Sequence, residues 1–497
     1  MNKPKVSLRE KAAKGIVWSV IQKWGREGIS SIALIVLSRL LVPEAFGLVA
    51  LASVFTAFAS VFLDQGFGAA IVQRKELEPE HLDTAFWITI ASGLIMTSIG
   101  VAGSGLIAGL FKEPDLAPVI RWLSLSFVIS ALSSTQIAIL QRKLAFKALA
   151  ARSLAAAMMG GVVGVSLAFA GFGVWSLVAQ DLASGVAGVF VLWRASEWRP
   201  GLNLSRKHYK ELFTFGISVI GNNTLKVLMR RSDDLLIGYF LGPVLLGYYT
   251  IGYQLLLFIT RLVTEITDAV AFPAFSRLQH NPARLRNAFY RVTQYTSLLA
   301  FPVFIGLASV AQELVPVVFG AKWAPSIPVM QVLAFIGILQ SVMFFNNSIL
   351  RAAGRPSWEF GIMLLTSASS VIGFLVAVRW GIVAVAASFV FVGYLLSPVS
   401  YAAVKRLVRI EIKTYLRQFI APLLSSLVMV AVVLALKFLL KPQDLNSYVE
   451  LAIYVLAGGL TYLIFILLTA RQVSYEVLDL ANLVLPKGKF RKVSGNG

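Results

Sequence analysis

Apolar runs, each about as long as a membrane-crossing helix, recur along almost the whole of this chain. A helix needs roughly 20 mainly apolar residues to cross a bilayer. Fourteen runs meet that length, at 15–41, 47–72, 84–111, 118–140, 153–170, 172–192, 212–241, 245–270, 293–310, 327–350, 360–378, 382–402, 419–440 and 451–468. The composition agrees, since 57% of the 497 residues are hydrophobic and only 14% are charged. The sequence predicts an all-α integral membrane protein with about fourteen transmembrane helices.

The distribution of positive charge predicts how these helices cross the membrane. With the N-terminus in the cytoplasm and the spans alternating, most basic residues fall in cytoplasmic segments. One such segment holds Arg142, Lys143, Lys147 and Arg152. The outer connections hold Lys112, Lys322, Arg379, Lys437 and Lys441. This asymmetry follows the positive-inside rule, so both termini are expected in the cytoplasm. The net charge of +21 then reflects topology and contact with anionic lipids, and no nucleic-acid partner is expected.

A short pattern recurs at an offset of 200 residues. The first predicted span ends in LVPEAFG at 41–47, and the seventh ends in LGPVLLG at 241–247. Together with a weaker echo at Gly173 and Gly381, this predicts two six-helix bundles of the same orientation, with a substrate site between them. The expected divisions are an N-terminal bundle at 1–193, a cytoplasmic linker at 194–211, a second bundle at 212–402, and two extra helices with a basic tail at 403–497.

Several ionisable residues fall inside predicted spans, where they are costly and usually face a cavity. Helical spacing places one net-basic polar stripe on the first span and another on the seventh. Such stripes predict a cationic cleft for an anionic ligand such as pyrophosphate. The candidates for contact with this ligand are Lys23, Arg26, Lys226, Arg230 and Arg261. The supporting polar residues are Asn222, Asn223, Asp233 and Asp234.

Carboxylates in the same spans are candidates for coupling transport to an ion. They are Glu27, Asp64, Glu265 and Asp268, which could bind protons or coordinate Na⁺. A purely structural role stays open for these charges. The pairs Lys23–Glu27 and Arg261–Glu265 have the spacing of neighbours on a helix and could simply neutralise each other. Arg230 could likewise pair with Asp233 or Asp234.

The sequence carries no motif of an enzyme or of a nucleotide-driven pump. It has no cysteine, no G-x-x-x-x-G-K-[ST] loop and no Ser–His–Asp or metal-ligand pattern. Its three histidines, His81, His208 and His280, fall in predicted loops. We therefore expect no catalytic residue, no metal site and no cofactor. An H⁺ or Na⁺ gradient is the expected source of energy.

Six short segments resemble bacterial polysaccharide flippases. They are SLREK at 7–11, QRKE at 73–76, PDLAP at 114–118, LSLSF at 123–127, FPAF at 272–275 and VPVVFGAKW at 315–323. The resemblance is to Wzx-like flippases of the colanic-acid exporter type, within the multidrug/oligosaccharidyl-lipid/polysaccharide flippase superfamily. It covers most of the first twelve spans, and the order of the segments is more specific than any one of them.

This resemblance implies a function. Flippases of this type move an undecaprenyl-pyrophosphate-linked repeat unit from the cytoplasmic to the periplasmic leaflet of the bacterial inner membrane. The resemblance further implies ion-driven alternating access between two bundles, and a role in the assembly of exopolysaccharide, lipopolysaccharide or capsule. A polysaccharide polymerase or co-polymerase is the partner protein that such a role suggests.

Two other functions fit a chain of this class. A multidrug or small-molecule exporter of the same superfamily would have an acidic, aromatic-lined cavity, and the net-basic stripes argue against it. An enzyme or scaffold of polysaccharide synthesis would need a water-facing catalytic constellation or long loops, whereas the predicted outer loops are all short.

Overall fold

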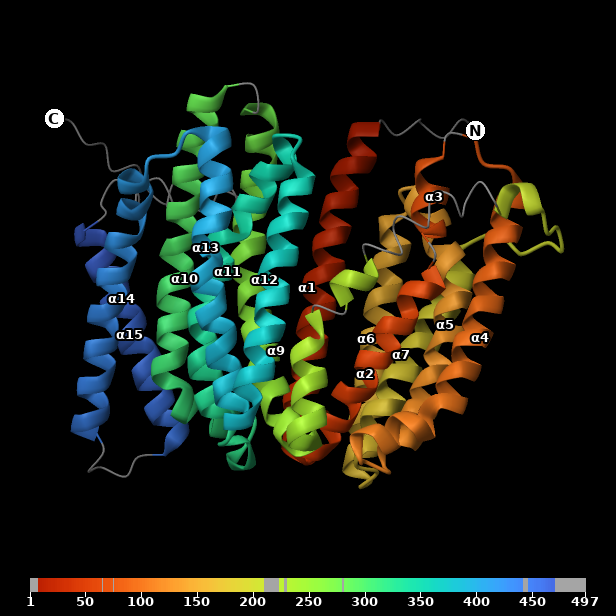
Figure 1. The fold of residues 1–497 in the computed structure, drawn as a ribbon, viewed down its shortest axis with the longest axis horizontal. Coiled ribbons are helices and arrows are strands. Elements are labelled where there is room, and N and C mark those ends of the chain that lie inside the picture. Colours follow the sequence, from red (N-terminus) through yellow and green to blue (C-terminus); the bar gives the residue numbers. More distant parts are fainter. Residues whose placement is uncertain are drawn as a thin grey trace. The chain divides into compact units, whose positions relative to one another are not determined.

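The computed structural model describes residues 8–64, 66–74, 76–209, 223–227, 230–278, 281–440 and 446–469. Their regular structure is helical, with no strand among the described residues, which confirms the predicted all-α class. The first helices are α1 (Leu8–Leu40), α2 (Pro43–Asp64), α3 (Phe67–Gln73), α4 (Pro79–Phe111), α5 (Leu116–Arg142), α6 (Phe146–Phe169) and α7 (Val174–Ala195) (Figure 1). The later ones are α9 (Ser232–Leu278), α10 (Pro282–Val318), α11 (Ser326–Ala352), α12 (Pro356–Ala377), α13 (Ile382–Val408), α14 (Ile412–Leu440) and α15 (Ser447–Thr469).

Twelve of the described helical segments are long and apolar enough to cross a membrane. Each of them overlaps a predicted span. Several begin well before the predicted edge, as at Ala283 rather than 293, and Ser232–Thr264 runs from the end of the seventh predicted span into the eighth. Helix α1 fills the first predicted span but is not among the twelve, since Lys23, Arg26 and Glu27 interrupt its apolar sequence. Residues 212–222 and 228–229 of the seventh predicted span lie outside the described residues, and the end of that span forms the start of α9.

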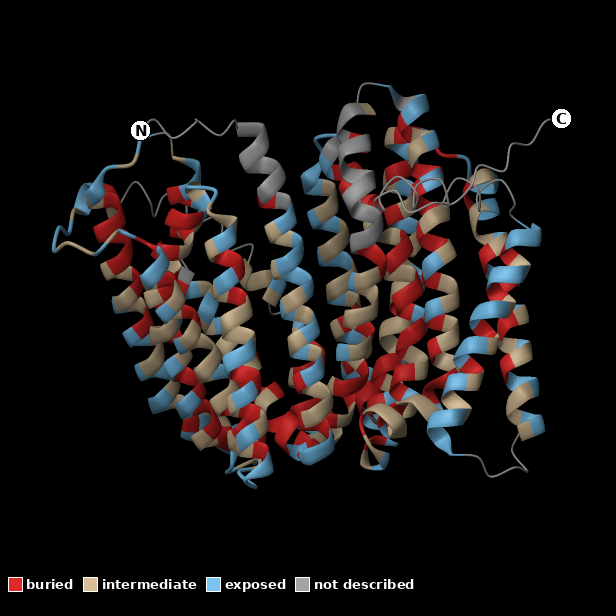
Figure 2. Ribbon diagram, turned by 180° about the vertical axis from the view of Figure 1, so that it is seen from behind, coloured by how far each residue is buried: buried red, intermediate tan, exposed pale blue. Residues whose placement is uncertain are grey.

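Large apolar side chains cover the exposed faces of these helices. Figure 2 shows exposed residues along the length of the outer helices. On α15 these residues are Val455, Leu456, Leu460, Leu463, Ile464, Leu467 and Leu468. An aqueous surface rarely carries so much apolar area, whereas lipid accepts it and requires the backbone polar groups to be paired within helices. The chain is therefore a multi-pass membrane protein.

Contacts between residues divide the chain into two compact units. Unit 1 comprises Met1–Ile251, Val318–Trp323 and Phe374–Val385. Unit 2 comprises Gly252–Val317, Ala324–Gly373 and Ala386–Gly497. In unit 1, α1 packs against α6, α4 against α5, and α6 against α7. In unit 2, α14 packs against α15.

Helix α9 reverses direction at Gly242, within unit 1. Gly242 has φ 81° and ψ 175°, a conformation that suits glycine because it has no Cβ. The Tyr249 hydroxyl donates a hydrogen bond of 3.0 Å to Asp233, 16 residues earlier. A straight helix would separate two such residues by about 24 Å, so the chain must fold back between them. This reversal lies where the sequence predicts the break between the seventh and eighth spans.

The two proline–glycine segments that recur in the sequence pack against each other in unit 1. A Cβ atom added at Gly47 would lie 1.7 Å from the carbonyl oxygen of Pro243. One added at Gly247 would lie 2.0 Å from the carbonyl oxygen of Pro43. At both positions only glycine fits, because the neighbouring atom belongs to the backbone. The contact is reciprocal, as it would be between two segments related by a twofold axis.

The loop between α10 and α11 holds the turn between α1 and α2. The Trp323 side chain is fully buried, and its indole N–H donates a hydrogen bond of 2.8 Å to the carbonyl oxygen of Ser38. Its ring meets Phe46 edge-on, with the centroids 5.3 Å apart. Lys322 donates to the carbonyl oxygen of Arg39 at 2.9 Å. These contacts explain why 318–323 belong to unit 1 although the helices on either side belong to unit 2.

A buried ion pair joins α14 to α10 in unit 2. Lys437 Nζ lies 2.7 Å from Glu313 Oε2 and donates to the carbonyl oxygen of Ser309 at the same distance. The ammonium also lies 5.6 Å from the centre of the Tyr454 ring on α15. The two charged side chains are 18% and 16% exposed, so water reaches little of either. The last two helices are thus connected to α10 by specific polar contacts as well as by apolar packing.

Candidate functional site

The basic residues predicted on the first span lie on α1, beside α6. Lys23 and Arg26 are exposed and Glu27 is half-buried. The Gln22 side chain on the same helix donates a hydrogen bond of 2.9 Å to Ser153 of α6. Arg26 lies close enough to Arg152 of α6 for their positive charges to repel each other. Two helices of unit 1 therefore bring positive charge to one place.

The other predicted site residues lie on later segments. Lys226, Arg230 and Arg261 are exposed, and Asn223 is half-buried. Asn222 and the side chains of Asp64, Glu265 and Asp268 lie outside the described part of the chain. The roles predicted for all these residues stay predictions.

Asp233 and Asp234 are buried in the first turn of α9, and both have partners there. Asp233 accepts hydrogen bonds from the Tyr249 hydroxyl and from the Asp234 N–H, each at 3.0 Å. Arg231, just before the start of α9, forms an ion pair of 2.9 Å with Asp234. Acidic residues in a first turn also interact favourably with the helix dipole. These contacts give both carboxylates a structural role at the start of α9.

Arg152 lies inside α6, not in the cytoplasmic connection where the sequence analysis put it. Helix α6 begins at Phe146, whereas the predicted span began at 153. The side chain is half-buried, and its Nε is buried without a hydrogen-bond partner among the described residues. Burying an unpaired charged donor is costly. A bound anion would supply the acceptor that this guanidinium lacks.

A pocket of ≈ 480 Å³ opens beside Arg152 within unit 1. Helices α2, α3, α5, α6 and α7 all contribute to its walls. Besides Arg152, its polar lining residues are Ser60, Ser130, Ser133, Ser134 and Gln141. Gly188 of α7 leaves room for the guanidinium, because a Cβ there would lie 3.2 Å from Arg152 Nε. A guanidinium among hydroxyl groups suits phosphate oxygens and sugar hydroxyls. We call this the Arg152 pocket.

A second pocket, of ≈ 400 Å³, lies within unit 2 and is mainly apolar. Its aromatic lining residues are Phe301, Tyr394, Tyr401, Tyr415 and Phe419. Aliphatic residues of α11, including Ile338 and Val342, complete the wall. The lining suits a hydrocarbon chain rather than a charged group.

The sequence around Arg152 favours a helix that begins before it, but the prediction gave more weight to its positive charge. The run FKALAARSLAAA begins at Phe146 and consists mostly of strong helix formers, with Lys147 and Arg152 as its only charges. Counting Arg152 toward the positive-inside pattern moved the predicted start of the span past it. The serines of the pocket are scattered over several helices, so their convergence could not be read from the sequence.

Known proteins share this architecture. The fold is similar to that of the lipid II flippase MurJ in its inward-closed conformation, with a TM-score of 0.75 and 15% sequence identity over 92% of this chain and 99% of that one. This chain thus shares its all-helical fold with that flippase.

The family follows from the sequence match. Residues 36–328 match the family described as "Polysaccharide biosynthesis protein", and the chain belongs to that family. The lipopolysaccharide biosynthesis protein WzxC of Escherichia coli (strain K12) is 29% identical over 88% of this chain and 90% of its own length. The teichuronic acid biosynthesis protein TuaB of Bacillus subtilis (strain 168) is 28% identical over 85% of this chain and 88% of its own. The resemblance found in the sequence is confirmed.

Proposed function

We propose that this protein is a flippase, not an enzyme, and that it moves lipid-linked oligosaccharide repeat units across the bacterial inner membrane. The observation that carries the proposal is the Arg152 pocket, where the Nε of a half-buried arginine is buried without a hydrogen-bond partner among the described residues and serine hydroxyls line the same space. Family membership supports it, as do relatives named for lipopolysaccharide and teichuronic acid biosynthesis and a fold shared with a lipid II flippase.

The substrate has a junction that matches this pocket. In an undecaprenyl-pyrophosphate-linked sugar, a multiply charged pyrophosphate joins the lipid to the oligosaccharide. Arg152 can donate two parallel hydrogen bonds to phosphate oxygens. Arg26 adds a second positive charge nearby, and an anion between the two groups would relieve their repulsion. The serine hydroxyls can then bind the first sugar.

The apolar pocket of unit 2 is a separate observation that supports a lipid-linked substrate. Its aromatic and aliphatic lining offers an isoprenoid chain a surface of matching polarity. A multidrug exporter for organic cations would gain nothing from an arginine in its pocket, because like charges repel. The basic character of the Arg152 pocket thus favours an anionic cargo over that alternative.

The mechanism we propose is alternating access between two related six-helix bundles, followed by two C-terminal helices, with both termini in the cytoplasm. The reciprocal packing of Gly47 and Gly247 supports the relation between the bundles. Glu27, Asp64, Glu265 and Asp268 remain the candidates for coupling to H⁺ or Na⁺. Anionic lipids and a polysaccharide polymerase or co-polymerase are the partners that this role suggests.

The test compares Arg152→Gln with the wild-type protein in a strain that lacks the gene. Export of surface polymer should fall by about 10- to 100-fold, since a charge-assisted hydrogen bond contributes about 1.5–3 kcal/mol. Complete lipid-linked repeat units should accumulate on the cytoplasmic leaflet. Arg152→Lys should retain part of the activity, and Arg379→Gln, which removes an exposed charge elsewhere, should retain all of it. Full export by a membrane-inserted Arg152→Gln protein would remove the Arg152 pocket from the transport path.

A further inference from the structure

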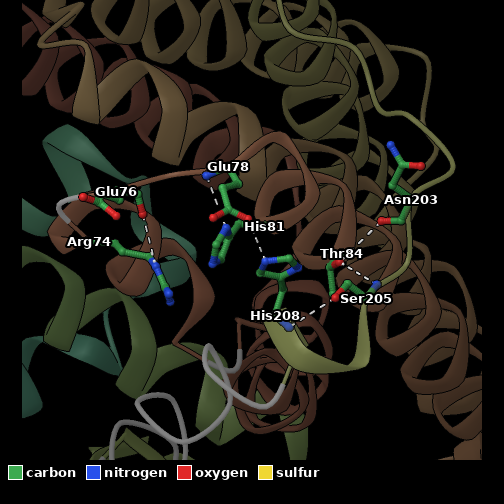
Figure 3. Close-up of polar contacts among 8 residues, drawn as sticks. All are labelled: Arg74, Glu76, Glu78, His81, Thr84, Asn203, Ser205 and His208. Atoms are coloured by element: carbon green, nitrogen blue, oxygen red, sulfur yellow. Dashed lines mark hydrogen bonds and ion pairs between the residues drawn. The ribbon is translucent and has the colours of Figure 1, made fainter.

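Glu78, His81 and His208 come together where the segment after α7 returns to the start of α4 (Figure 3). One potential ligand atom from each residue lies within 4.8 Å of the other two. His81 and His208 are 2% and 8% exposed, whereas the Glu78 side chain is 60% exposed. The sequence analysis put both histidines in loops. Instead, His81 lies in the first turn of α4 and His208 in a helical turn at 206–209.

Direct contacts connect the three side chains. Glu78 Oε2 lies 3.0 Å from His208 Nε2, and the Glu78 N–H donates a hydrogen bond of 3.2 Å to His81 Nδ1. The centroids of the two imidazole rings lie 4.1 Å apart, and the ring planes are tilted by 59° to each other. His208 Nδ1 is buried and has no hydrogen-bond partner among the described residues. Two largely buried imidazoles and an exposed carboxylate therefore converge at one place.

The surrounding structure holds His208 in place independently of this cluster. Asp83 accepts a hydrogen bond of 3.0 Å from the Gly201 N–H, and the Trp87 indole donates one of 2.7 Å to the Gly201 carbonyl oxygen. The Thr84 hydroxyl accepts the Ser205 N–H at 3.1 Å. All three anchoring side chains belong to α4, as do His81 and its cap Glu78. The segment that carries His208 is thus fixed against the helix that carries the other two potential ligands.

We propose that Glu78, His81 and His208 form a binding site for a divalent transition-metal ion of the Zn²⁺ class. Two imidazole nitrogens and one carboxylate oxygen, with water in the fourth position, are a common tetrahedral zinc set. Imidazole ligands favour Zn²⁺, Co²⁺ or Cu²⁺ over Mg²⁺ and Ca²⁺, which take oxygen ligands. This proposal does not depend on the transported substrate.

Metal binding at His208 requires only that one proton move from one ring nitrogen to the other. A neutral His208 that donates to the Glu78 carboxylate carries its proton on Nε2, between the ring and Glu78. The metal takes this position, and the proton moves to His208 Nδ1. His81 offers one ring nitrogen, and at Nδ1 the metal would compete with the hydrogen bond of 3.2 Å from the Glu78 N–H.

A bound metal would tie the segment after α7 to α4. Glu78 and His208 are 130 residues apart in the sequence, so the metal would close a long loop at the edge of unit 1. Arg206 and Lys207, next to His208, are exposed and offer sites to trypsin. Metal binding should therefore protect the chain from cleavage at these two residues.

The test uses the full chain, purified in detergent without a histidine tag and stripped of metal with a chelator. Titration with ZnCl₂ should give one bound ion per chain and slow the tryptic cleavage after Arg206 and Lys207. Removing a residue that only supports a metal ligand costs about 10- to 100-fold in affinity, so Glu78→Gln and His208→Gln should each lose at least about 100-fold. Glu80→Gln, which changes a carboxylate in the same turn of α4, should bind as tightly as the wild type.

A second variant keeps the proposal testable should His208→Gln misfold. The chain has no cysteine, so the thiolate of His208→Cys would be the only one present. This variant should still bind Zn²⁺, and with Co²⁺ it should show a thiolate-to-metal charge-transfer band that the wild type lacks. The proposal is overturned if the wild type binds neither ion. It is equally overturned if binding persists unchanged in Glu78→Gln and His208→Gln, or if His208→Cys gives no such band.

Discussion

The ring of Phe111 meets the ring of Tyr239 edge-on, with the centroids 5.8 Å apart and the planes at 86°. Phe111 is the last residue of α4, and Tyr239 lies just before the reversal at Gly242. The α4–α5 loop of the first predicted bundle thus contacts the turn within α9 of the second. Trp323, from the second predicted bundle, contacts the α1–α2 turn of the first in the same manner. Transport that opens this end of unit 1 must break both sets of contacts.

A covalent link between Phe111 and Tyr239 should therefore stop transport. Because the chain has no cysteine, the double variant Phe111→Cys/Tyr239→Cys would carry the only two thiols. A short bis-thiol-reactive cross-linker should join them and abolish polymer export, and a cleavable version should restore export on reduction. Each single-cysteine variant treated alike is the control. Undiminished export by fully cross-linked protein would mean that this end stays closed throughout the cycle.

Substituting alanine at either Gly47 or Gly247 should destabilise the protein severely. The added methyl would press on a backbone carbonyl in each case, and overpacking of this kind costs about 1–3 kcal/mol or more. Thermal unfolding in detergent should show a large drop in Tm for both variants. Gly28→Ala on α1 is the matched control, since no atom lies within 4 Å of its added Cβ, and helix propensity should make it neutral or slightly stabilising. Equal Tm values for all three would contradict the reciprocal contact.

Glu113, in the loop after α4, should make stability depend on pH. Burial, with the nearby charges of Glu44 and Asp115, raises the pKa of the Glu113 carboxyl above its ordinary value of 4.5. Between 4.5 and the raised pKa the folded form binds more protons than the unfolded form, so stability should fall as the pH rises through that window. Glu113→Gln mimics the protonated form. It should raise Tm above the window and have no effect below it.

The control for this pH effect is Glu76→Gln, which neutralises an exposed carboxylate elsewhere in unit 1. Its Tm should follow that of the wild type at every pH. A Glu113→Gln protein whose Tm also follows the wild type throughout would show that the Glu113 carboxyl titrates alike in the folded and unfolded forms.

The sequence predicted the helices well because apolar length is a local property. The break near Gly242 and the repeat of Pro43–Gly47 at Pro243–Gly247 were visible for the same reason. Loop packing was not visible. Glu78 and His208 meet only because Asp83 and its neighbours hold a segment that lies far along the chain.

The prediction that Arg152 lies in a cytoplasmic connection was wrong because it relied on the positive-inside pattern rather than on helix propensity. One basic residue contributes to topology whether it lies in a loop or in the first turns of a helix, so the pattern alone cannot place it. Its unpaired Nε becomes informative only once the neighbouring helices are known. For the polar stripes predicted on the first and seventh spans, helical spacing shows which residues share a face. It does not show whether that face lines a cavity or contacts another helix.

The ion pair between Lys437 and Glu313 should show strong coupling in a double-mutant cycle. Lys437→Met leaves Glu313 buried without its counter-charge, and breaking a buried pair in this way costs about 3–5 kcal/mol. Removing both charges in Lys437→Met/Glu313→Leu should restore stability close to that of the wild type, because apolar residues can replace a buried pair at little cost. Reversible unfolding in mixed micelles would give the four free energies of unfolding.

Lys413→Met, which removes an exposed lysine near the start of α14, is the control and should change the free energy of unfolding by less than about 0.5 kcal/mol. If the double variant is as unstable as Lys437→Met, the two charges do not compensate each other. The hydrogen bond from Lys437 to the Ser309 carbonyl oxygen, and its contact with the Tyr454 ring, would then be what fastens α14 and α15 to α10. Restored stability would instead assign that role to apolar packing, with the ion pair required only because each charge would be costly without the other.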